Sequence, residues 1–300
     1  MYTRLLSFLL AVICILISNR AMASEAGLTV FVSIAPQKYI VRQIGQHLVE
    51  IHIMVPAGAS PATYEPKPQQ MVTLAHSAIY FSIGVPFENA WLSKIAAANT
   101  SMRVVATDQG IRKRPMQSDH HHGHGHGKHA DEAHDDHETT LDPHIWLSPP
   151  LVLRQARTIL GALQQADPIN GDLYAANFNL FAKQIQELDD QLREMFANLQ
   201  GASFMVYHPS WGYFAQAYGL RQVPLEIEGK APKPSQLKQL IEFARHEKVR
   251  AIFVQPQFSA KSANLIARAI DAKVIVADPL AINWAANLRR QATAFKAALR

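Results

Sequence analysis

Histidine is concentrated in one short part of this chain. The 300 residues include 14 histidines, and eight of these fall within 18 residues. The eight are His120, His121, His122, His124, His126, His129, His134 and His137. Imidazoles interspersed with glycine and acidic residues cannot build a core, whereas neutral imidazole is a common ligand of Zn²⁺, Ni²⁺ and Cu²⁺. The segment is therefore predicted to capture metal ions, with a solvated linker as the alternative, and its composition names no single metal.

Three further residues combine a metal-ligating side chain with the end of a predicted strand or loop. His144 follows the histidine-rich segment, His208 ends the apolar strand FMVY, and Asp278 ends the strand KVIV. Ligands bind beyond the carboxyl ends of the strands in parallel α/β sheets. We therefore expect His208 and Asp278 to face a cleft. The alternative is local, because His or Asp before proline often only caps or turns the chain.

Strand and helix patterns alternate along the chain on both sides of the histidine-rich segment. Strands are predicted at 28–34, 49–55, 79–84, 102–106, 203–207, 222–227, 251–255 and 273–277. Helices are predicted at 37–45, 69–76, 88–98, 150–165, 172–199, 211–218, 235–247, 260–270 and 282–299. Such alternation is typical of parallel sheets covered on both faces. The fold class is thus α/β, with two similar parallel-sheet domains.

The helix predicted over 172–199 is long enough to join these two domains. Its apolar residues recur every three or four positions from Phe181 to Leu199, which makes one continuous stripe. At ~1.5 Å per residue the helix spans about 42 Å, the size of a domain. We therefore predict an N-terminal domain over 24–165, a rigid linking helix within 166–200 and a C-terminal domain over 201–300. Residues 112–140, which lack apolar periodicity, are expected to form a disordered loop.

The first 23 residues are typical of a secretory signal peptide. Arg4 precedes an apolar run, and Ala21-Met22-Ala23 offers small residues for cleavage before Ser24. The only cysteine, Cys14, lies within this run, so the mature chain is expected to hold no disulfide or thiolate–metal site. We expect a periplasmic protein. The basic residues form no run interleaved with aromatics, which argues against nucleic acid as a partner.

Five segments of the mature chain form a recognisable set: residues 56–66 (PAGASPATYEP), 142–149 (DPHIWLSP), 208–214 (HPSWGYF), 226–230 (EIEGK) and 278–280 (DPL). Through these segments the whole mature chain resembles a known family, the ZnuA-like periplasmic proteins that supply zinc or manganese to ABC importers. It implies two α/β domains bridged by a long helix, with the metal between them. It also implies that His144, His208 and Asp278 are ligands.

One position departs from the family pattern, which reads Pro-His-x-Tyr-Glu-Pro at the first ligand. Here that histidine is replaced by Ala62, whose methyl group cannot coordinate a metal. Three replacements stay open: a water, a carboxylate such as Glu65 or Glu228, or a histidine from the loop. Zinc sites with three protein ligands and a water are typical of catalysis. A water or a loop histidine is the replacement we favour.

The resemblance implies a solute-binding protein without catalytic activity. It would capture Zn²⁺ in the interdomain cleft and pass it to an inner-membrane ABC permease, and we expect it to be a monomer. The alternatives are a protein for Mn²⁺ or another divalent metal, a metal buffer acting through the histidine-rich loop, and a zinc hydrolase with a three-ligand site. No HExxH motif supports the hydrolase.

Overall fold

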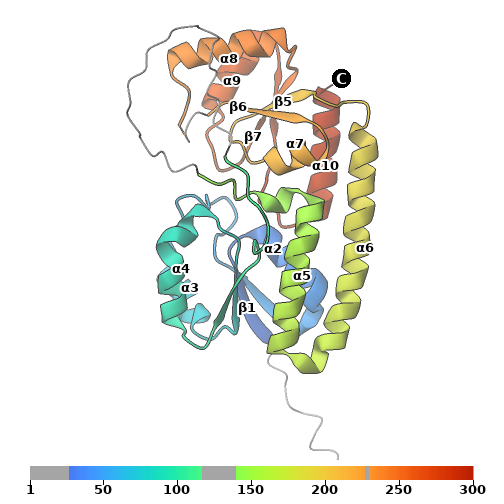
Figure 1. Ribbon diagram of the computed structural model, residues 1–300. Coiled ribbons are helices and arrows are strands. Elements are labelled where there is room, and N and C mark those ends of the chain that lie inside the picture. The colour runs from blue at the N-terminus through green and yellow to red at the C-terminus, as the bar shows by residue number, and fades with distance from the viewer. Residues whose placement is uncertain (1–26, 117–139, 227–229, 300) are drawn as a thin grey trace, which may run out of the picture.

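The computed structural model describes residues 27–116, 140–226 and 230–299. They form two lobes, each built on a four-stranded parallel sheet (Figure 1). The strand order is β2-β1-β3-β4 in the N-terminal lobe and β6-β5-β7-β8 in the C-terminal lobe, so both sheets have the same topology. The predicted fold class of two similar parallel-sheet units is therefore confirmed.

The elements of the N-terminal lobe alternate as the sequence predicts. The strands are β1 (Leu28–Val32), β2 (Val49–Ile53), β3 (Ile79–Ser82) and β4 (Arg103–Ala106), and the helices are α2 (Ala35–Gly45), α3 (Pro68–Leu74), α4 (Pro86–Ala98) and α5 (Pro149–Ala166). Short 3₁₀ turns occupy Gln46–Leu48, Ile145–Leu147 and Pro168–Asn170.

The C-terminal lobe repeats this alternation. Its strands are β5 (Ser203–Val206), β6 (Arg221–Pro224), β7 (Ala251–Val254) and β8 (Lys273–Val276), and its helices are α7 (Gly212–Ala217), α8 (Pro234–His246), α9 (Lys261–Ile270) and α10 (Trp284–Ala298).

Local sequence explains where several helices begin and why the inner strands of each sheet are buried. Proline occupies the first turn of α2, α3, α4, α5 and α8, where its missing N–H costs nothing and its fixed φ suits the helix. The strands β3 (IYFS) and β7 (AIFV) are buried along their whole length. Continuous apolar runs of this kind are expected for inner strands of a parallel sheet that is covered on both faces.

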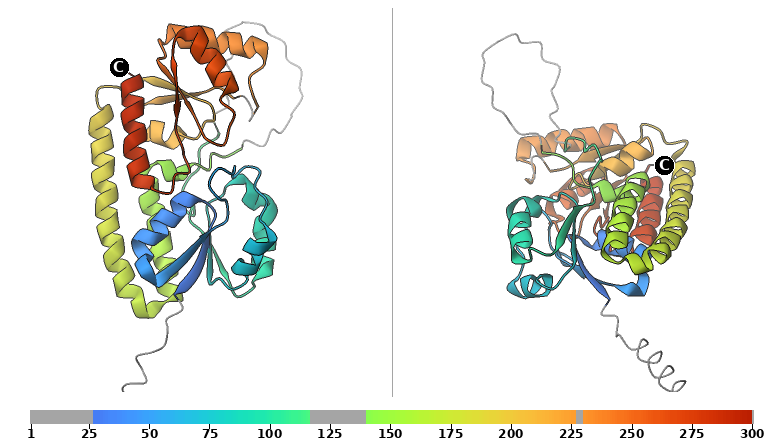
Figure 2. Two further views of the ribbon diagram at one scale, coloured as in Figure 1. Left: turned by 180° about the vertical axis from the view of Figure 1, so that it is seen from behind. Right: turned by 60° about the horizontal axis from the view of Figure 1, so that its bottom comes forward.

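Helix α6 (Gly171–Phe196) runs beside both lobes (Figures 1 and 2). Asn177 donates a hydrogen bond to the Ile44 carbonyl of α2 (3.0 Å), and Gln191 accepts one from Arg289 of α10 (3.2 Å). Its buried residues continue the apolar stripe that the sequence shows. At ~1.5 Å per residue its 26 residues span about 39 Å, so α6 serves as a brace between the lobes.

The lobes also contact each other through buried tryptophans. The indole N–H of Trp146, between the lobes, donates to the Pro279 carbonyl (2.7 Å). The indole N–H of Trp284, at the start of α10, donates to the Trp146 carbonyl (2.6 Å). Because buried indole N–H groups need partners, these two bonds fix the segments that carry His144 and Asp278 relative to one another.

Several element boundaries differ by one to three residues from the sequence predictions; the strand predicted at 222–227, for example, ends at Pro224. Helix α6 ends at Phe196, three residues before the predicted end, and the chain then turns through Gly201 at a positive φ of 76°. Residues 112–116, predicted as part of the loop, lie within the described structure, where Arg114 donates to the Gly212 carbonyl (2.7 Å). The rest of that loop, at 117–139, lies outside the described residues. In the described part of the chain, no helix is long and apolar enough to cross a membrane.

Candidate metal site

His144 is held in a fixed orientation by its own segment. It precedes the 3₁₀ turn at Ile145–Leu147, and the Asp142 carboxylate accepts hydrogen bonds from both the backbone N–H of His144 (3.0 Å) and its Nδ1 (2.7 Å). Asp142 is almost fully buried and also lies 3.8 Å from Arg114. An ionised carboxylate only accepts, so Nδ1 carries the proton and Nε2 keeps its lone pair in the neutral ring.

His208 follows β5 and lies at the point where the strand order of the C-terminal sheet reverses. Parallel α/β sheets bind ligands at this switch point, here between β5 and β7. The buried Glu226 carboxylate accepts from His208 Nδ1 (2.6 Å), which again leaves Nε2 free to coordinate. Gln255, which follows β7, accepts from the His208 backbone N–H (3.1 Å) and donates to its carbonyl (2.7 Å). The imidazole also stacks on Phe258, with ring centroids 5.0 Å apart.

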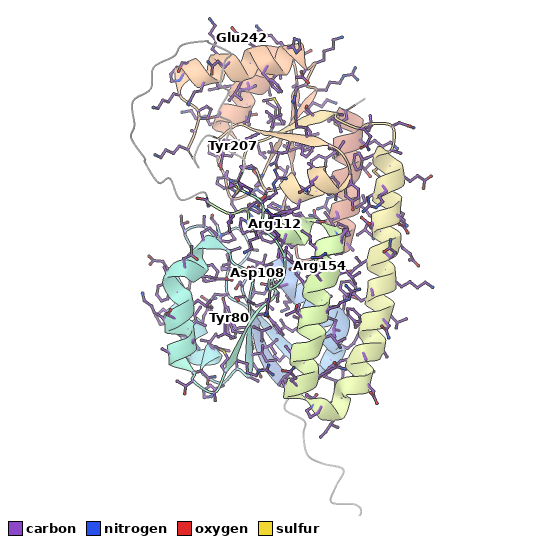
Figure 3. All side chains as sticks on the ribbon, in the orientation of Figure 1. Tyr80, Asp108, Arg112, Arg154, Tyr207 and Glu242 are labelled. Atoms are coloured by element: carbon purple, nitrogen blue, oxygen red, sulfur yellow. The ribbon has the colours of Figure 1, made fainter. Side chains whose placement is uncertain are left out.

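The two imidazoles meet across the boundary between the lobes. Their ring centroids are 5.2 Å apart and the rings cross at 69°. Figure 3 shows Tyr207, the residue before His208, on the side of the C-terminal lobe that faces the N-terminal lobe. Carboxylate partners on Nδ1 are the usual second layer of histidine-bound metal sites, where they fix the tautomer and raise ligand basicity.

Both rings border one cavity of about 80 Å³. Its walls are mostly apolar and come from both lobes: Ser60, Pro61, Ala62, Val85, Pro86, Met116, Pro143, His144, Trp146, His208, Gln257, Phe258, Pro279 and Leu280. This volume exceeds what a single ordered water needs, so the cavity has room for a metal ion together with waters.

The other residues singled out from the sequence lie in different surroundings. Asp278 is half-buried, does not line the cavity, and accepts a hydrogen bond from the Leu280 N–H (2.8 Å). Glu65 is exposed and is also absent from the cavity walls. Glu228 and the eight clustered histidines lie outside the described residues. Among the residues that the structure does describe, no group of three or more His, Cys, Asp or Glu is arranged to hold a metal ion.

Ala62 lies in the cavity wall, at the position where the family pattern has histidine. It is exposed, and its backbone N–H donates to Ser60 Oγ (3.3 Å). The position of the family's first ligand is therefore in the wall of the cavity that His144 and His208 also border.

Several residues that orient the two imidazoles or border the cavity were not assigned a role from the sequence. Asp142 and Glu226 orient the imidazoles, Gln255 holds the His208 backbone, and Met116 lines the cavity. Asp142 lies within the DPH motif, two residues before its histidine, so local spacing offered a signal. Glu226 and Gln255 are 18 and 47 residues from His208, and only the pairing of β5 with β6 and β7 brings them together.

Burial lowers the pKa of His144, and the hydrogen bond from its ring to Asp142 offsets part of that effect. The folded protein thus binds fewer protons at this site than the unfolded chain does near the ordinary histidine value of about 6.5. The contribution of His144 to the free energy of unfolding is therefore greatest at a pH above the ordinary histidine pKa. This contribution decreases as the pH falls below that pKa.

We accordingly expect the metal-free protein to lose stability between pH 7.5 and 5.5, and a His144→Gln variant to lose less. The wild type is expected to lose more stability than the variant over this interval, because only the wild type has a buried imidazole to protonate as the pH falls. Urea unfolding of both proteins at the two pH values measures it. Equal losses in the wild type and the variant would contradict the effect of burial on His144.

Comparisons with known proteins agree with this architecture. The family model described as zinc-uptake complex component A, periplasmic, matches residues 30–298. The high-affinity zinc uptake system protein ZnuA of Yersinia pestis is 29% identical over 271 residues, covering 85% of this chain and 84% of its own.

Solved structures of zinc-uptake proteins also resemble this chain. A crystal structure of ZnuA is 39% identical, superposes with a TM-score of 0.82, and covers 91% of this chain and 100% of its own. A 138–173 ZnuA deletion mutant with zinc bound is 40% identical, with a TM-score of 0.81, and covers 91% of this chain and 98% of its own.

Proposed function

This chain belongs to the family of periplasmic zinc-uptake components, and we propose that it binds Zn²⁺ between its lobes through His144 and His208. The family consists of solute-binding proteins that work with a membrane ABC permease of a metal importer. The observation that carries the assignment is the pair of facing imidazoles, each held through Nδ1 by a buried carboxylate. In this proposal Nε2 of each ring coordinates the ion.

The remaining coordination positions have to be filled by groups outside this pair. Zinc prefers four ligands, and the cavity has room for waters beside the ion. We propose Asp278 as a third ligand. It directly precedes Pro279 and Leu280, which line the cavity. For the position that Ala62 leaves empty, we favour water or a histidine of the 117–139 segment over Glu65 or Glu228. Glu65 is exposed and does not line the cavity, whereas the 117–139 segment begins directly after Met116 in the cavity wall.

The lining favours Zn²⁺ over Mn²⁺. Imidazole suits zinc, whereas manganese is better served by carboxylate, carbonyl and water oxygens. In the described part of the chain the cavity wall contains two imidazoles and no carboxylate. A manganese carrier is the alternative, and it would require several carboxylates to enter the site.

The same arrangement supports binding rather than catalysis. A zinc hydrolase needs a general base within reach of the metal-bound water. The two buried carboxylates near the imidazoles, Asp142 and Glu226, are both engaged by histidine Nδ1 atoms. The proposal is therefore a carrier without enzymatic activity. Turnover of an ester or peptide that depends on His208 would favour the hydrolase.

We further propose that the eight clustered histidines collect metal ions near the cleft. The ends of their segment lie at the cavity: Met116 is in its wall, and its N–H donates to the Thr140 carbonyl (2.8 Å). Pro115 and Leu141 form an antiparallel bridge just outside this pair. The two ends of the segment are thus joined whether or not the histidines are present.

Deleting residues 118–138 is expected to reduce the number of Zn²⁺ ions bound per chain while one cleft site persists. The deletion leaves Gln117 and Thr139 to connect Met116 with Thr140, which are already hydrogen-bonded. Calorimetry with and without the segment measures the stoichiometry. A variant with a Gly/Ser segment of equal length separates the chemistry of the histidines from the length of the loop. Loss of nearly all metal binding would instead identify a buffer that acts through the loop.

Export and delivery complete the proposal. Relatives are periplasmic or lipoprotein solute-binding proteins. We propose that residues 1–23 are removed as a signal peptide. The mature chain then consists of an N-terminal domain (24–165), a linking helix (166–200) and a C-terminal domain (201–300). In this proposal the mature protein is a monomer that delivers its metal to an inner-membrane permease. Calorimetric titration of the tag-free mature protein with Zn²⁺ at pH 7.5 tests the core of this function, and absence of binding would contradict it.

A further inference from the structure

A thioether lies in the cavity wall together with the two imidazoles. Met116 is half-buried and borders the same cavity as His144 and His208. The hydrogen bond from its N–H to Thr140 and the adjoining bridge between Pro115 and Leu141 fix its backbone there. The proposed zinc site makes no use of this sulfur.

The charge balance of the cavity also differs from what a doubly charged ion requires. Within the described residues its walls contain no Asp or Glu, and Asp142 and Glu226 act on it only through the imidazoles. The cost of removing an ion from water grows with the square of its charge. A divalent ion must therefore keep its waters or recruit a carboxylate, whereas the free-energy cost of dehydrating a monovalent ion is lower.

The ligand types in the walls indicate which monovalent ion fits. Thioether and imidazole together suit a soft ion, and thioether sulfur is among the soft ligands that favour Cu(I). Zinc takes thiolate, imidazole and carboxylate ligands, so a thioether adds little to its binding. Ala62 supplies neither imidazole nor carboxylate, which leaves His144, His208 and Met116 as the soft donors of the described cavity.

We propose that the cleft also binds Cu(I), coordinated by His144, His208 and the thioether of Met116. The inference rests on the proposed function only in that both use the same two imidazoles. It adds a second metal class and a ligand that distinguishes the two metals, because loss of the sulfur weakens Cu(I) binding and leaves Zn²⁺ binding in place.

The test compares Met116→Leu with Met195→Leu in the full mature chain. Leucine conserves volume, so both variants are expected to fold. Met195 is likewise half-buried, on α6, and does not line the cavity. Cu(I) affinity is measured anaerobically by competition with a chromophoric Cu(I) chelator, and X-ray absorption at the copper edge reports sulfur in the coordination shell. Residues 117–139 contain no Met or Cys, so they cannot supply that sulfur.

We expect Met116→Leu to lower Cu(I) affinity about tenfold and to abolish the sulfur signal, with Met195→Leu unchanged. A wild-type copper shell of nitrogen alone, or equal Cu(I) affinity in the two variants, would overturn the proposal. Zn²⁺ titrations of the same proteins separate the two claims. Zinc affinity should agree within about twofold in all three. Absence of zinc binding in the wild type would contradict the proposed function without altering the copper result.

Discussion

Replacing His208 by alanine is expected to lower the Zn²⁺ affinity of the cleft by about 100-fold or more, because one of two converging imidazoles is lost. The change also leaves the buried Glu226 carboxylate without the Nδ1–H that it accepts. Calorimetry on the background lacking residues 118–138 measures the effect without competition from the clustered histidines.

The matched control for this experiment is His246→Ala. His246 lies at the end of α8 with a side chain that is 85% exposed, away from the cavity. Its removal is expected to leave cleft affinity unchanged. Equal affinity in the His208→Ala variant and the control would show that the metal binds elsewhere. Near- and far-ultraviolet circular dichroism on each variant checks that the lobes remain folded.

The reverse substitution, Ala62→His, is expected to raise Zn²⁺ affinity by about 100-fold. Position 62 is exposed and lines the cavity that His144 and His208 border, so an imidazole added there is expected to reach the bound ion. It would supply a third histidine and bring zinc closer to the four ligands that it prefers.

Ala57→His is the control for that gain. Ala57 is exposed in the same loop but does not border the cavity. If both variants bound zinc more tightly by the same factor, the gain would come from an added surface imidazole and not from the first-ligand position. If Ala62→His changed nothing, the wall at position 62 would not face the bound ion.

The fold could be predicted from the sequence because the patterns of apolar residues that specify its strands and helices are local and repeated. The apolar runs of β3 and β7 and the stripe along α6 each reflect burial on a fixed period. The end of α6 was placed three residues late because Leu199 continues the stripe beyond the last helical turn. Its burial comes from packing against the core, and not from membership in the helix.

Residues 112–116 differ from the predicted loop for another reason. Arg112-Lys113-Arg114 has the composition of a solvated loop, yet Lys113 pairs with Asp108 (2.5 Å) and Arg114 contacts Gly212, nearly one hundred residues away. Contacts between lobes leave no periodic trace in the sequence. Composition alone therefore cannot separate an ordered basic segment from a solvated one.

Part of the site could be predicted from the sequence. Strand ends and the DPH and HP motifs identified His144 and His208, and the alignment of the family pattern exposed the missing ligand at Ala62. The positions of Glu226 and Gln255, which hold His208, depend on strand pairing, and the place of Met116 in the cavity wall depends on how the lobes meet; no local spacing encodes either. Asp278 remains a proposed ligand, since in the described structure its carboxylate binds the Leu280 N–H.

The most direct test of the cleft site is a crystal structure of the mature protein soaked with Zn²⁺, with anomalous diffraction recorded at the zinc edge. The account predicts a strong anomalous peak between Nε2 of His144 and Nε2 of His208, beside Ala62. A chain that binds zinc only at other positions, with no peak between these two imidazoles, would contradict it.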